Sequence, residues 1–268
     1  MPAGVLQKRR RRRTYFIECA AMKIATWNVN GIRARHEQFG AFVASEQPDI
    51  ICLQEIKAKL EQVPQTVCDL PDYSCYWHGA GGYSGVALHI RRASFAEEPT
   101  FSHPDFDHET RIVQAELGDT VFASVYVPNG GKDYQAKIAF MKSLVRYARS
   151  IGDSGRKLVI SGDYNVARTE MDVHPKERKP VIGQLPEERD LLEEIIGQGL
   201  VDVGRTLYPD DENYFTWWAP WRSMRQRNIG WRLDYVLASE SLAKRAVSCP
   251  SLRETGTSDH APVVATFE

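Results

Sequence analysis

Polar side chains recur where predicted strands end, and together their types suit chemistry on a phosphate group. They fall at six places along the chain: Asn28 and Asn30, Gln54 and Glu55, Tyr126 and Asn129, Asp163 and Asn165, Asp234, and Asp259 with His260. Taken singly, an Asp or Asn after a strand is most often a turn residue or a helix cap. Six such places are harder to explain as independent turns, because strand ends are where an α/β protein assembles a site from distant segments. We therefore predict one site at these strand ends.

The oxygen-rich composition of this set favours a hard divalent cation. Mg²⁺ prefers carboxylate and amide oxygens and usually keeps several waters, so Glu55 is the best candidate ligand, with Asn30 or Asp259 near it. Mn²⁺ is the alternative ion. No group of cysteines and histidines has the spacing of a zinc site, and the seven histidines are scattered. Phosphodiester hydrolysis also requires an activated water and donors for the charge that develops on the phosphate. We expect these from Asp163, His260, Asn165 and Tyr126.

The elements that must position these residues alternate between strands and helices. Apolar runs predict strands over residues 23–29, 49–54, 85–90, 120–127, 157–161, 233–238 and 263–267. Helical spacing of apolar residues predicts an amphipathic helix over 133–150, and a proline with acidic residues at the start predicts another over 186–196. Many strands with a few helices indicate an α/β sandwich with sheets at its centre.

Composition limits the remaining choices. Residues 1–21 contain a run of basic residues and predict a non-structural extension, whereas residues 22–268, with 28 basic and 34 acidic residues, are long enough for one catalytic domain. The net charge of −6 for this part argues mildly against nucleic acid as a partner. No apolar run is long enough to span a bilayer, and five cysteines without a C-x-x-C spacing indicate reduced thiols. We expect a cytoplasmic monomer that does not bind membranes.

Six ordered motifs then give a close resemblance to a known family. They are W-N-V-N-G-I-R-A at 27–34, L-Q-E-I-K at 53–57, Y-V-P-N at 126–129, G-D-Y-N-V-A at 162–167, G-W-R-L-D-Y at 230–235 and S-D-H-A-P at 258–262. Together they resemble the exonuclease III family of AP endonucleases, from about residue 22 to the C-terminus. The resemblance implies a deoxyribonuclease I-like, four-layered α/β sandwich in which helices flank two mixed central β-sheets. It also implies a DNA-repair phosphodiesterase that cuts double-stranded DNA 5′ to abasic sites and acts at blocked 3′ ends.

The resemblance assigns roles to single positions. Glu55 binds the metal ion with Asn30 beside it and Asp259 contributing; Asn30 stands where some members have an aspartate, which weakens one contact. Asp163 positions the attacking water, and either Asp163 or a metal-bound hydroxide acts as the base. Asp234 holds His260, which contacts the phosphate. The remaining contacts to the site, the phosphate or the DNA backbone fall to Asn28, Asn129, Arg111, Asn165 and Tyr126.

Aromatic residues near the C-terminus are expected to set specificity. The resemblance places Trp217, Trp231 and Leu233 in the wall of a pocket for the flipped abasic sugar, while Trp218 is expected to be core. Trp221 and the nearby arginines, Arg225 among them, form a basic stretch suited to phosphates. Two alternatives remain open: a phosphoesterase of the same fold that acts on inositol phosphates or sphingomyelin, and a catalytically idle DNA-binding module.

Two further motifs are assigned no function. The glycine-rich segment at 79–85 precedes a predicted strand rather than a helix, so we expect a hairpin turn and not a dinucleotide loop. His103 and His174 have acidic neighbours, but isolated histidines are more often surface residues, and that is what we expect of both.

Overall fold

Two six-stranded sheets form the centre of the computed structural model, which describes residues 21–268. The first sheet has the order β11-β12-β1-β2-β4-β3. Its strands are β1 (Met22–Asn28), β2 (Ile50–Gln54), β3 (Tyr73–His78), β4 (Val86–Arg91), β11 (Ala246–Ser248) and β12 (Val263–Phe267). The second sheet has the order β5-β6-β7-β8-β10-β9. Its strands are β5 (Thr100–Ser102), β6 (Ile112–Leu117), β7 (Thr120–Tyr126), β8 (Lys157–Asp163), β9 (Leu200–Asp202) and β10 (Asp234–Ser239).

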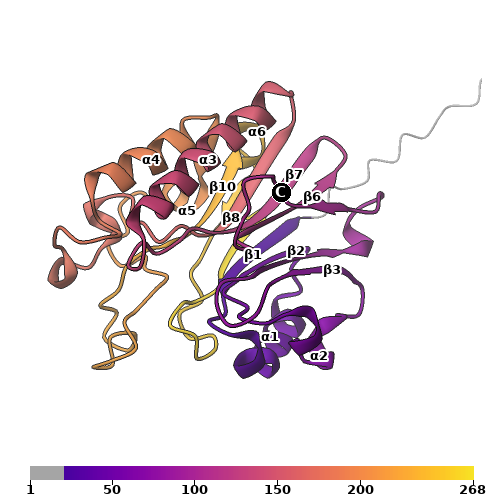
Figure 1. Ribbon diagram of the computed structural model, residues 1–268, viewed down its shortest axis with the longest axis horizontal. Helices are drawn as coiled ribbons and strands as arrows, with labels where there is room; N and C mark the ends of the chain where they lie inside the picture. The colour runs from indigo at the N-terminus through magenta and orange to yellow at the C-terminus, as the bar shows by residue number, and fades with distance from the viewer. Residues whose placement is uncertain (1–20) are drawn as a thin grey trace, which may run out of the picture.

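Helices cover the two outer faces, so the fold has four layers (Figure 1). Against the first sheet lie α1 (Ile32–Glu46) and α2 (Gln65–Cys68); against the second lie α3 (Tyr134–Asp153) and α4 (Pro186–Ile196). Two short helices, α5 (Val203–Leu207) and α6 (Glu240–Ala243), complete the α-helices of the described residues. The predicted four-layered sandwich with mixed sheets is confirmed, because β1 pairs with β2 and β7 with β8 in parallel while the other ladders are antiparallel.

Each layer boundary is filled by apolar side chains. Ile24, Leu88 and Phe122 belong to the core between the sheets, Phe39 of α1 packs on the first sheet, and Leu144 of α3 packs on the second sheet. Central strands such as β2 and β7 are buried along their whole length, which explains their nearly continuous apolar sequence. Burial of this apolar surface is what holds the two sheets face to face.

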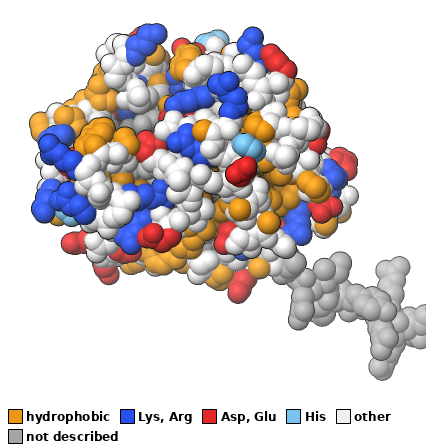
Figure 2. Space-filling model, turned by 90° about the horizontal axis from the view of Figure 1, so that it is seen from below, with side chains coloured by type: hydrophobic (Ala, Val, Ile, Leu, Met, Phe, Trp, Pro, Cys, Tyr) orange, Lys and Arg blue, Asp and Glu red, His pale blue; other side chains and the backbone are white. Residues whose placement is uncertain are grey.

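Strand register brings the polar strand ends of both sheets to one end of the sandwich. Asn28 is opposite Gln54 in the first sheet, and Asp163 is opposite both Tyr126 and Asp234 in the second. The loops that precede β10 and β12, gold and yellow in Figure 1, extend toward the same end. Viewed from there, groups of Lys and Arg side chains lie among exposed hydrophobic ones (Figure 2). This face therefore carries groups of basic side chains although the net charge of the chain is negative.

Several local predictions can be checked against these elements. The bounds of α4 and β12 agree with the predicted ones, and residues 79–85 form the connection of the antiparallel β3–β4 hairpin. The predicted extension over residues 1–21 lies outside the described residues, apart from Ala21. Among the residues that the structure describes, no helix combines the length and apolar character needed to cross a membrane.

Candidate active site

A buried group of two carboxylates and one imidazole lies at the shared strand ends. Asp163 is the last residue of β8, Asp234 the first of β10, and His260 precedes β12. His260 Nδ1 is 2.8 Å from Asp234 Oδ2, and His260 Nε2 is 3.7 Å from Asp163 Oδ2. All three residues are less than 5% exposed. The imidazole therefore lies between two buried carboxylates, with its Nδ1 side fixed by Asp234.

Two asparagines hold the Asp163 carboxylate in place. Asn28 at the end of β1 donates from Nδ2 to Asp163 Oδ2 at 2.9 Å and to Glu55 Oε1 at 3.0 Å. The backbone N–H of Asn165 donates to Asp163 Oδ1 at 2.9 Å. Because β1 and β8 belong to different sheets, the Asn28 amide ties the two halves of the sandwich together at the site. Asp163 and Glu55 are thus positioned relative to each other by one side chain.

The expected metal ligands already receive a positive charge from the protein. Lys57 Nζ is 2.6 Å from Glu55 Oε2 and donates to Asn30 Oδ1 at 2.6 Å. Asn30 Nδ2 donates to Asp259 Oδ1 at 2.7 Å, which brings the third predicted ligand to the same place. An ammonium group on these oxygens shows that they present a concentrated negative potential, so the donor set fits a hard divalent cation.

The backbone around these oxygens adopts a conformation that side chains rarely take. Asn30, Glu55 and Asn165 have φ values of 45°, 49° and 52°, in the left-handed region. Such residues are uncommon unless their surroundings fix them, and they concentrate at functional sites. Here the fixation is visible: Asn30 N donates to Asn28 Oδ1 at 3.0 Å, and Asn165 N donates to Asp163.

Burial and mutual charge shift the acid–base properties of the group. Burial raises the pKa of Asp163, the charges of Asp234 and Glu55 add to this effect, and the opposing attraction of His260 still leaves a pKa of about 7. Burial alone lowers the pKa of His260, but Asp234 and Asp163 outweigh it and raise that pKa to about 10. Burial also raises the pKa of Glu55, yet hydrogen bonds from Lys57 and Asn28 make the net shift downward. At neutral pH, His260 is a cation, and Asp163 is poised to exchange a proton.

The two most buried histidines give a direct test of this electrostatic picture. His89 is completely buried between Phe39 and Trp77, and burial lowers its pKa to about 3. We therefore expect His260 to remain protonated at about pH 8 and His89 to remain neutral at about pH 5, whereas an unperturbed histidine titrates near pH ~6.5. Long-range ¹H–¹⁵N spectra of the metal-free chain, assigned with His89→Phe, measure both states. Two rings that titrate together near neutrality would contradict the predicted electrostatics.

Tyr126 and Arg111 line the side of the group nearest β6 and β7. The Arg111 guanidinium lies 5.0 Å from the centre of the Tyr126 ring, and its Nε donates to Glu109 at 2.7 Å. Arg111 Nη1 is buried and has no hydrogen-bond partner among the described residues. Asn129 is exposed three residues beyond Tyr126, and its Oδ1 accepts from Gly131 N. Contacts from Arg111 and Asn129 to a bound phosphate stay predictions.

The predicted pocket residues come together beside His260. Trp217 and Trp231 are paired through an isolated bridge, and their rings meet edge to face at 5.5 Å. Both pack with Leu233 in one apolar cluster. Trp217 also bridges to His260 and donates from Nε1 to Asp259 Oδ2 at 3.0 Å. Gly183, with φ +91°, lies so close that an added Cβ would be 2.9 Å from the Trp231 ring.

Trp218 and Arg225 make their contacts outside the group of Trp217, Trp231 and Leu233. Trp218 is 1% exposed and packs in a separate core, as predicted. The Arg225 guanidinium lies 5.2 Å from the Trp218 ring and donates to the carbonyl oxygens of Arg253, Thr255 and Ser258. These bonds order the segment that leads to Asp259 and His260, and a phosphate contact by Arg225 stays a prediction.

Sequence patterns assigned no role to three residues that shape the site. Lys57 was visible only as part of a motif, and Thr216 donates from Oγ1 to Asp234 Oδ2 at 2.6 Å without any local signal. Ser258 Oγ donates to the Asn28 carbonyl at 2.7 Å, which secures the end of β1. Gln54, in contrast, is bound by Thr26 and donates to Ser124 inside the core, so it does not face the site.

Similarity to known proteins agrees with this geometry. The Endonuclease/Exonuclease/phosphatase family matches residues 25–260. Recombination repair protein 1 of Drosophila melanogaster is 36% identical over 252 residues, which are 92% of this chain but only 37% of that protein. The exodeoxyribonuclease of Bacillus subtilis (strain 168) is 34% identical over 252 residues, 90% of this chain and 98% of the relative.

Solved structures of DNA-repair enzymes are also similar to this chain. The 3′ phosphatase NExo from Neisseria, bound to a product DNA hairpin, has a TM-score of 0.83 and 29% identity over 92% of this chain and 99% of its own. An AP endonuclease from Archaeoglobus fulgidus has a TM-score of 0.79 and 29% identity over the same shares. The chain therefore belongs to the endonuclease/exonuclease/phosphatase family, as a hydrolytic nuclease related to the exonuclease III-like AP endonucleases.

Proposed function

We propose that this chain hydrolyses the DNA backbone on the 5′ side of abasic sites and also acts at 3′ ends as a 3′-phosphodiesterase, 3′-phosphatase and 3′→5′ exonuclease. The observation that carries the proposal is the buried Asp163–His260–Asp234 group directly beside the apolar Trp217–Trp231–Leu233 pocket. Relatives that are named as a DNA exonuclease, a 3′ phosphatase and an AP endonuclease support it.

Asp163 is proposed to take the proton of the attacking water. A general base works best when its pKa is near the working pH, and the pKa of Asp163 is about 7 because burial and neighbouring carboxylates raise it. The hydrogen bonds from Asn28 to Oδ2 and from the Asn165 backbone to Oδ1 hold both oxygens of the carboxylate in place. A water that binds to a remaining lone pair of this carboxylate is proposed to be oriented for in-line attack on the phosphorus.

His260 is proposed to bind the phosphate and to offset the charge that develops on its oxygens. The imidazole is cationic at neutral pH and is held on Nδ1 by Asp234, so Nε2 is the donor that faces the reacting group. Tyr126, Asn129 and the free Nη1 of Arg111 add donors from the β7 side.

The proposed cofactor is Mg²⁺, with Mn²⁺ as a substitute, held by Glu55, Asn30 and Asp259. When bound, the ion supplies Lewis-acid stabilisation of the phosphate and of the leaving oxygen. The Lys57 ammonium shares two of these oxygens and limits their mutual repulsion.

The pocket is proposed to select a sugar without a base. Its walls are two tryptophan rings and Leu233, and we propose that they accept a flipped deoxyribose and exclude an attached base by size. Flipping costs least where no base pairs or stacks, so an abasic nucleotide enters most readily. The indole N–H of Trp231 is buried and has no hydrogen-bond partner among the described residues, and we propose the bound sugar or phosphate as its partner.

Incision of a duplex oligonucleotide with one central abasic analogue tests the function. With a 5′ label, we expect a single Mg²⁺-dependent nick 5′ to the lesion that leaves a 3′-hydroxyl, no nick with EDTA, and no nick in an undamaged control. Removal of a 3′-phosphate without the nick would overturn the abasic-site assignment. If neither the abasic duplex nor a DNA with a 3′-phosphate is cleaved, inositol phosphates and phospholipids become the substrates to test.

Loss of the Trp217 wall should reduce discrimination. We expect Trp217→Ala to lower the ratio of kcat/KM for abasic over undamaged DNA by about tenfold or more, since the pocket then admits a larger group. Trp217→Phe keeps an aromatic wall but loses the N–H bond to Asp259, so it separates the two roles of this residue. Val247→Ala, at a residue of β11 that is 49% exposed and has no predicted contact with DNA, is the control outside the pocket. An unchanged ratio in Trp217→Ala would contradict the pocket assignment.

A further inference from the structure

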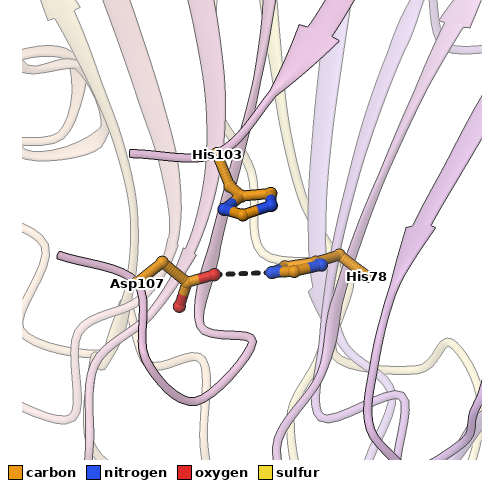
Figure 3. A group of neighbouring side chains, drawn as sticks. All are labelled: His78, His103 and Asp107. Atoms are coloured by element: carbon orange, nitrogen blue, oxygen red, sulfur yellow. Dashed lines mark hydrogen bonds and ion pairs between the residues drawn. The ribbon is translucent and has the colours of Figure 1, made fainter. Parts of the chain in front are cut away.

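Two histidines and an aspartate that are far apart in sequence meet outside the candidate active site (Figure 3). His78 is the last residue of β3, His103 follows β5, and Asp107 lies in the loop before β6. One ligand atom from each lies within 4.8 Å of the others. His78 Nε2 is 2.5 Å from Asp107 Oδ2, and the two imidazole rings are stacked with centres 4.5 Å apart. The expectation that His103 is an isolated surface residue is therefore wrong in one respect: it is exposed but not isolated.

The cluster bridges the edges of the two sheets. β3 is the last strand of the first sheet, and β5 is the last strand of the second. The rings of Tyr76 on β3 and Phe101 on β5 stack at 5.3 Å just beside the cluster. An ion held by His78 and His103 would therefore cross-link the two sheets at their open edge.

The aspartate of the cluster is pre-positioned and has no arginine or lysine partner among the described residues. Its Oδ1 accepts from the Arg111 backbone N–H at 2.7 Å, and its own N–H donates to the Pro104 carbonyl at 2.9 Å. The Asp107 side chain is 0% exposed, and its one ion pair in the described part of the chain is with His78. A buried carboxylate that is fixed through one oxygen and open at the other is the arrangement of a metal ligand with outer-shell support.

We propose that His78, His103 and Asp107 form a binding site for a divalent transition-metal ion of the Zn²⁺ class. Two imidazoles and a carboxylate are preferred by Zn²⁺ and its neighbours, whereas Mg²⁺ prefers oxygen ligands alone. Three protein ligands leave a fourth position for water, on the side where His103 is exposed. The ion takes the place of the proton shared by His78 and Asp107, and that proton is released to solvent.

This site is distinct from the Asp163–Asp234–His260 group in composition and in support. There His260 is engaged by Asp234 on Nδ1, whereas neither ring nitrogen of the exposed His103 forms a hydrogen bond within the part of the chain that the structure describes. Arg111 contacts residues of both sites: its backbone N–H donates to Asp107, and its guanidinium lies over the Tyr126 ring. Binding at the sheet edge is therefore expected to stabilise the fold without replacing Mg²⁺.

Zn²⁺ titration of the full chain in excess Mg²⁺ tests the proposal. After removal of metals, we expect one equivalent of Zn²⁺ to compete with a chromophoric chelator and to raise the Tm, and Co²⁺ to give the visible absorption of an ion with nitrogen ligands. Glu55→Gln, which damages the Mg²⁺ ligand set, should leave this equivalent in place.

Variants of the cluster decide the assignment. His103→Ala removes an exposed side chain, so it should fold, and Asp107→Asn keeps an oxygen for the Arg111 N–H. Each should weaken Zn²⁺ binding by about tenfold or more and abolish the rise in Tm. His108→Ala, an exposed histidine on the same loop, is the matched control and should bind normally. The proposal is overturned if no Zn²⁺ binds in excess Mg²⁺, or if binding survives both cluster variants, or if it is lost in Glu55→Gln.

Discussion

Asp163→Asn is expected to lower kcat by on the order of 10³ or more while DNA binding is retained. The carboxylate is buried, has a pKa of about 7 and faces the cationic His260, so it is the group best placed to accept a proton from water. An amide has almost the same shape but no basicity at this pH. The loss should therefore fall on the chemical step and not on assembly of the complex.

The hydrogen bonds and charges around Asp163 also determine how Asp163→Asn should affect the affinity for DNA. Its oxygens accept from Asn28 Nδ2 and from Asn165 N, and an amide can satisfy only part of these donors. The replacement also removes a negative charge that would face the phosphate, so affinity for DNA should be unchanged or higher.

Single-turnover cleavage and fluorescence anisotropy separate the two effects. Asp210→Asn, an exposed acid without a described hydrogen bond, is the control for loss of one charge. Near-normal turnover of Asp163→Asn would remove Asp163 from the role of base, and a large loss of binding would indicate that it organises the site instead.

Strong local patterns explain which parts of the fold could be predicted. β2 and β7 are buried on both faces and read as unbroken apolar runs, and α4 carries its own start signal of proline and acidic residues. The unpredicted α1 has only Ile32, Phe39 and Phe42 buried, which is too sparse to show a helical period. The edge strands β5 and β9 have three residues each and leave no recognisable pattern.

The residue types of the site could be predicted from the sequence, but the contacts between those residues could not. Its members lie at strand ends, and the parallel and antiparallel ladders bring those ends together, so the residue types alone indicated phosphate chemistry. Which atom touches which depends on contacts between distant segments, and no local pattern records those. Lys57 between Glu55 and Asn30 is one such contact, and the meeting of His78 with His103 is another.

The buried Arg232 is a third such contact, and it carries the largest expected effect on stability. It lies between Trp231 and Leu233 in sequence and is 1% exposed. Its Nη1 and Nη2 donate to the two oxygens of Asp202 at 2.9 and 2.8 Å, and its Nε donates to Asp172 Oδ1 at 2.7 Å. Burial raises the pKa of Asp172, but Arg232 and Arg205 outweigh it and lower that pKa to about 2.

We expect Arg232→Met to reduce the free energy of unfolding by about 3–5 kcal/mol, because it leaves two buried carboxylates with weakened compensation. Urea denaturation at neutral pH measures the loss. Lys244→Met, which breaks the exposed Lys244–Glu240 pair, should leave the free energy of unfolding nearly unchanged, because solvent screens this pair. A loss no larger than this control would show that Arg205 and Arg168 compensate the two carboxylates without Arg232.

The pH dependence of the free energy of unfolding provides a second, independent test of the role of Arg232. A carboxyl whose pKa is lowered in the folded state contributes stability above its unfolded pKa, near ~3.9, and loses that contribution as the pH falls through its folded pKa. For Asp172 this window ends at a pH of about 2. The difference in stability between the unchanged chain and Arg232→Met should therefore narrow as the pH is lowered from about 4 to about 2. A constant difference would mean that Arg232 acts through packing on Tyr235, whose ring centre lies 4.3 Å away, and not through charge.

In either case Trp231 and Leu233 lose the fixed residue between them, so the KM of Arg232→Met for abasic DNA should rise together with the loss of stability.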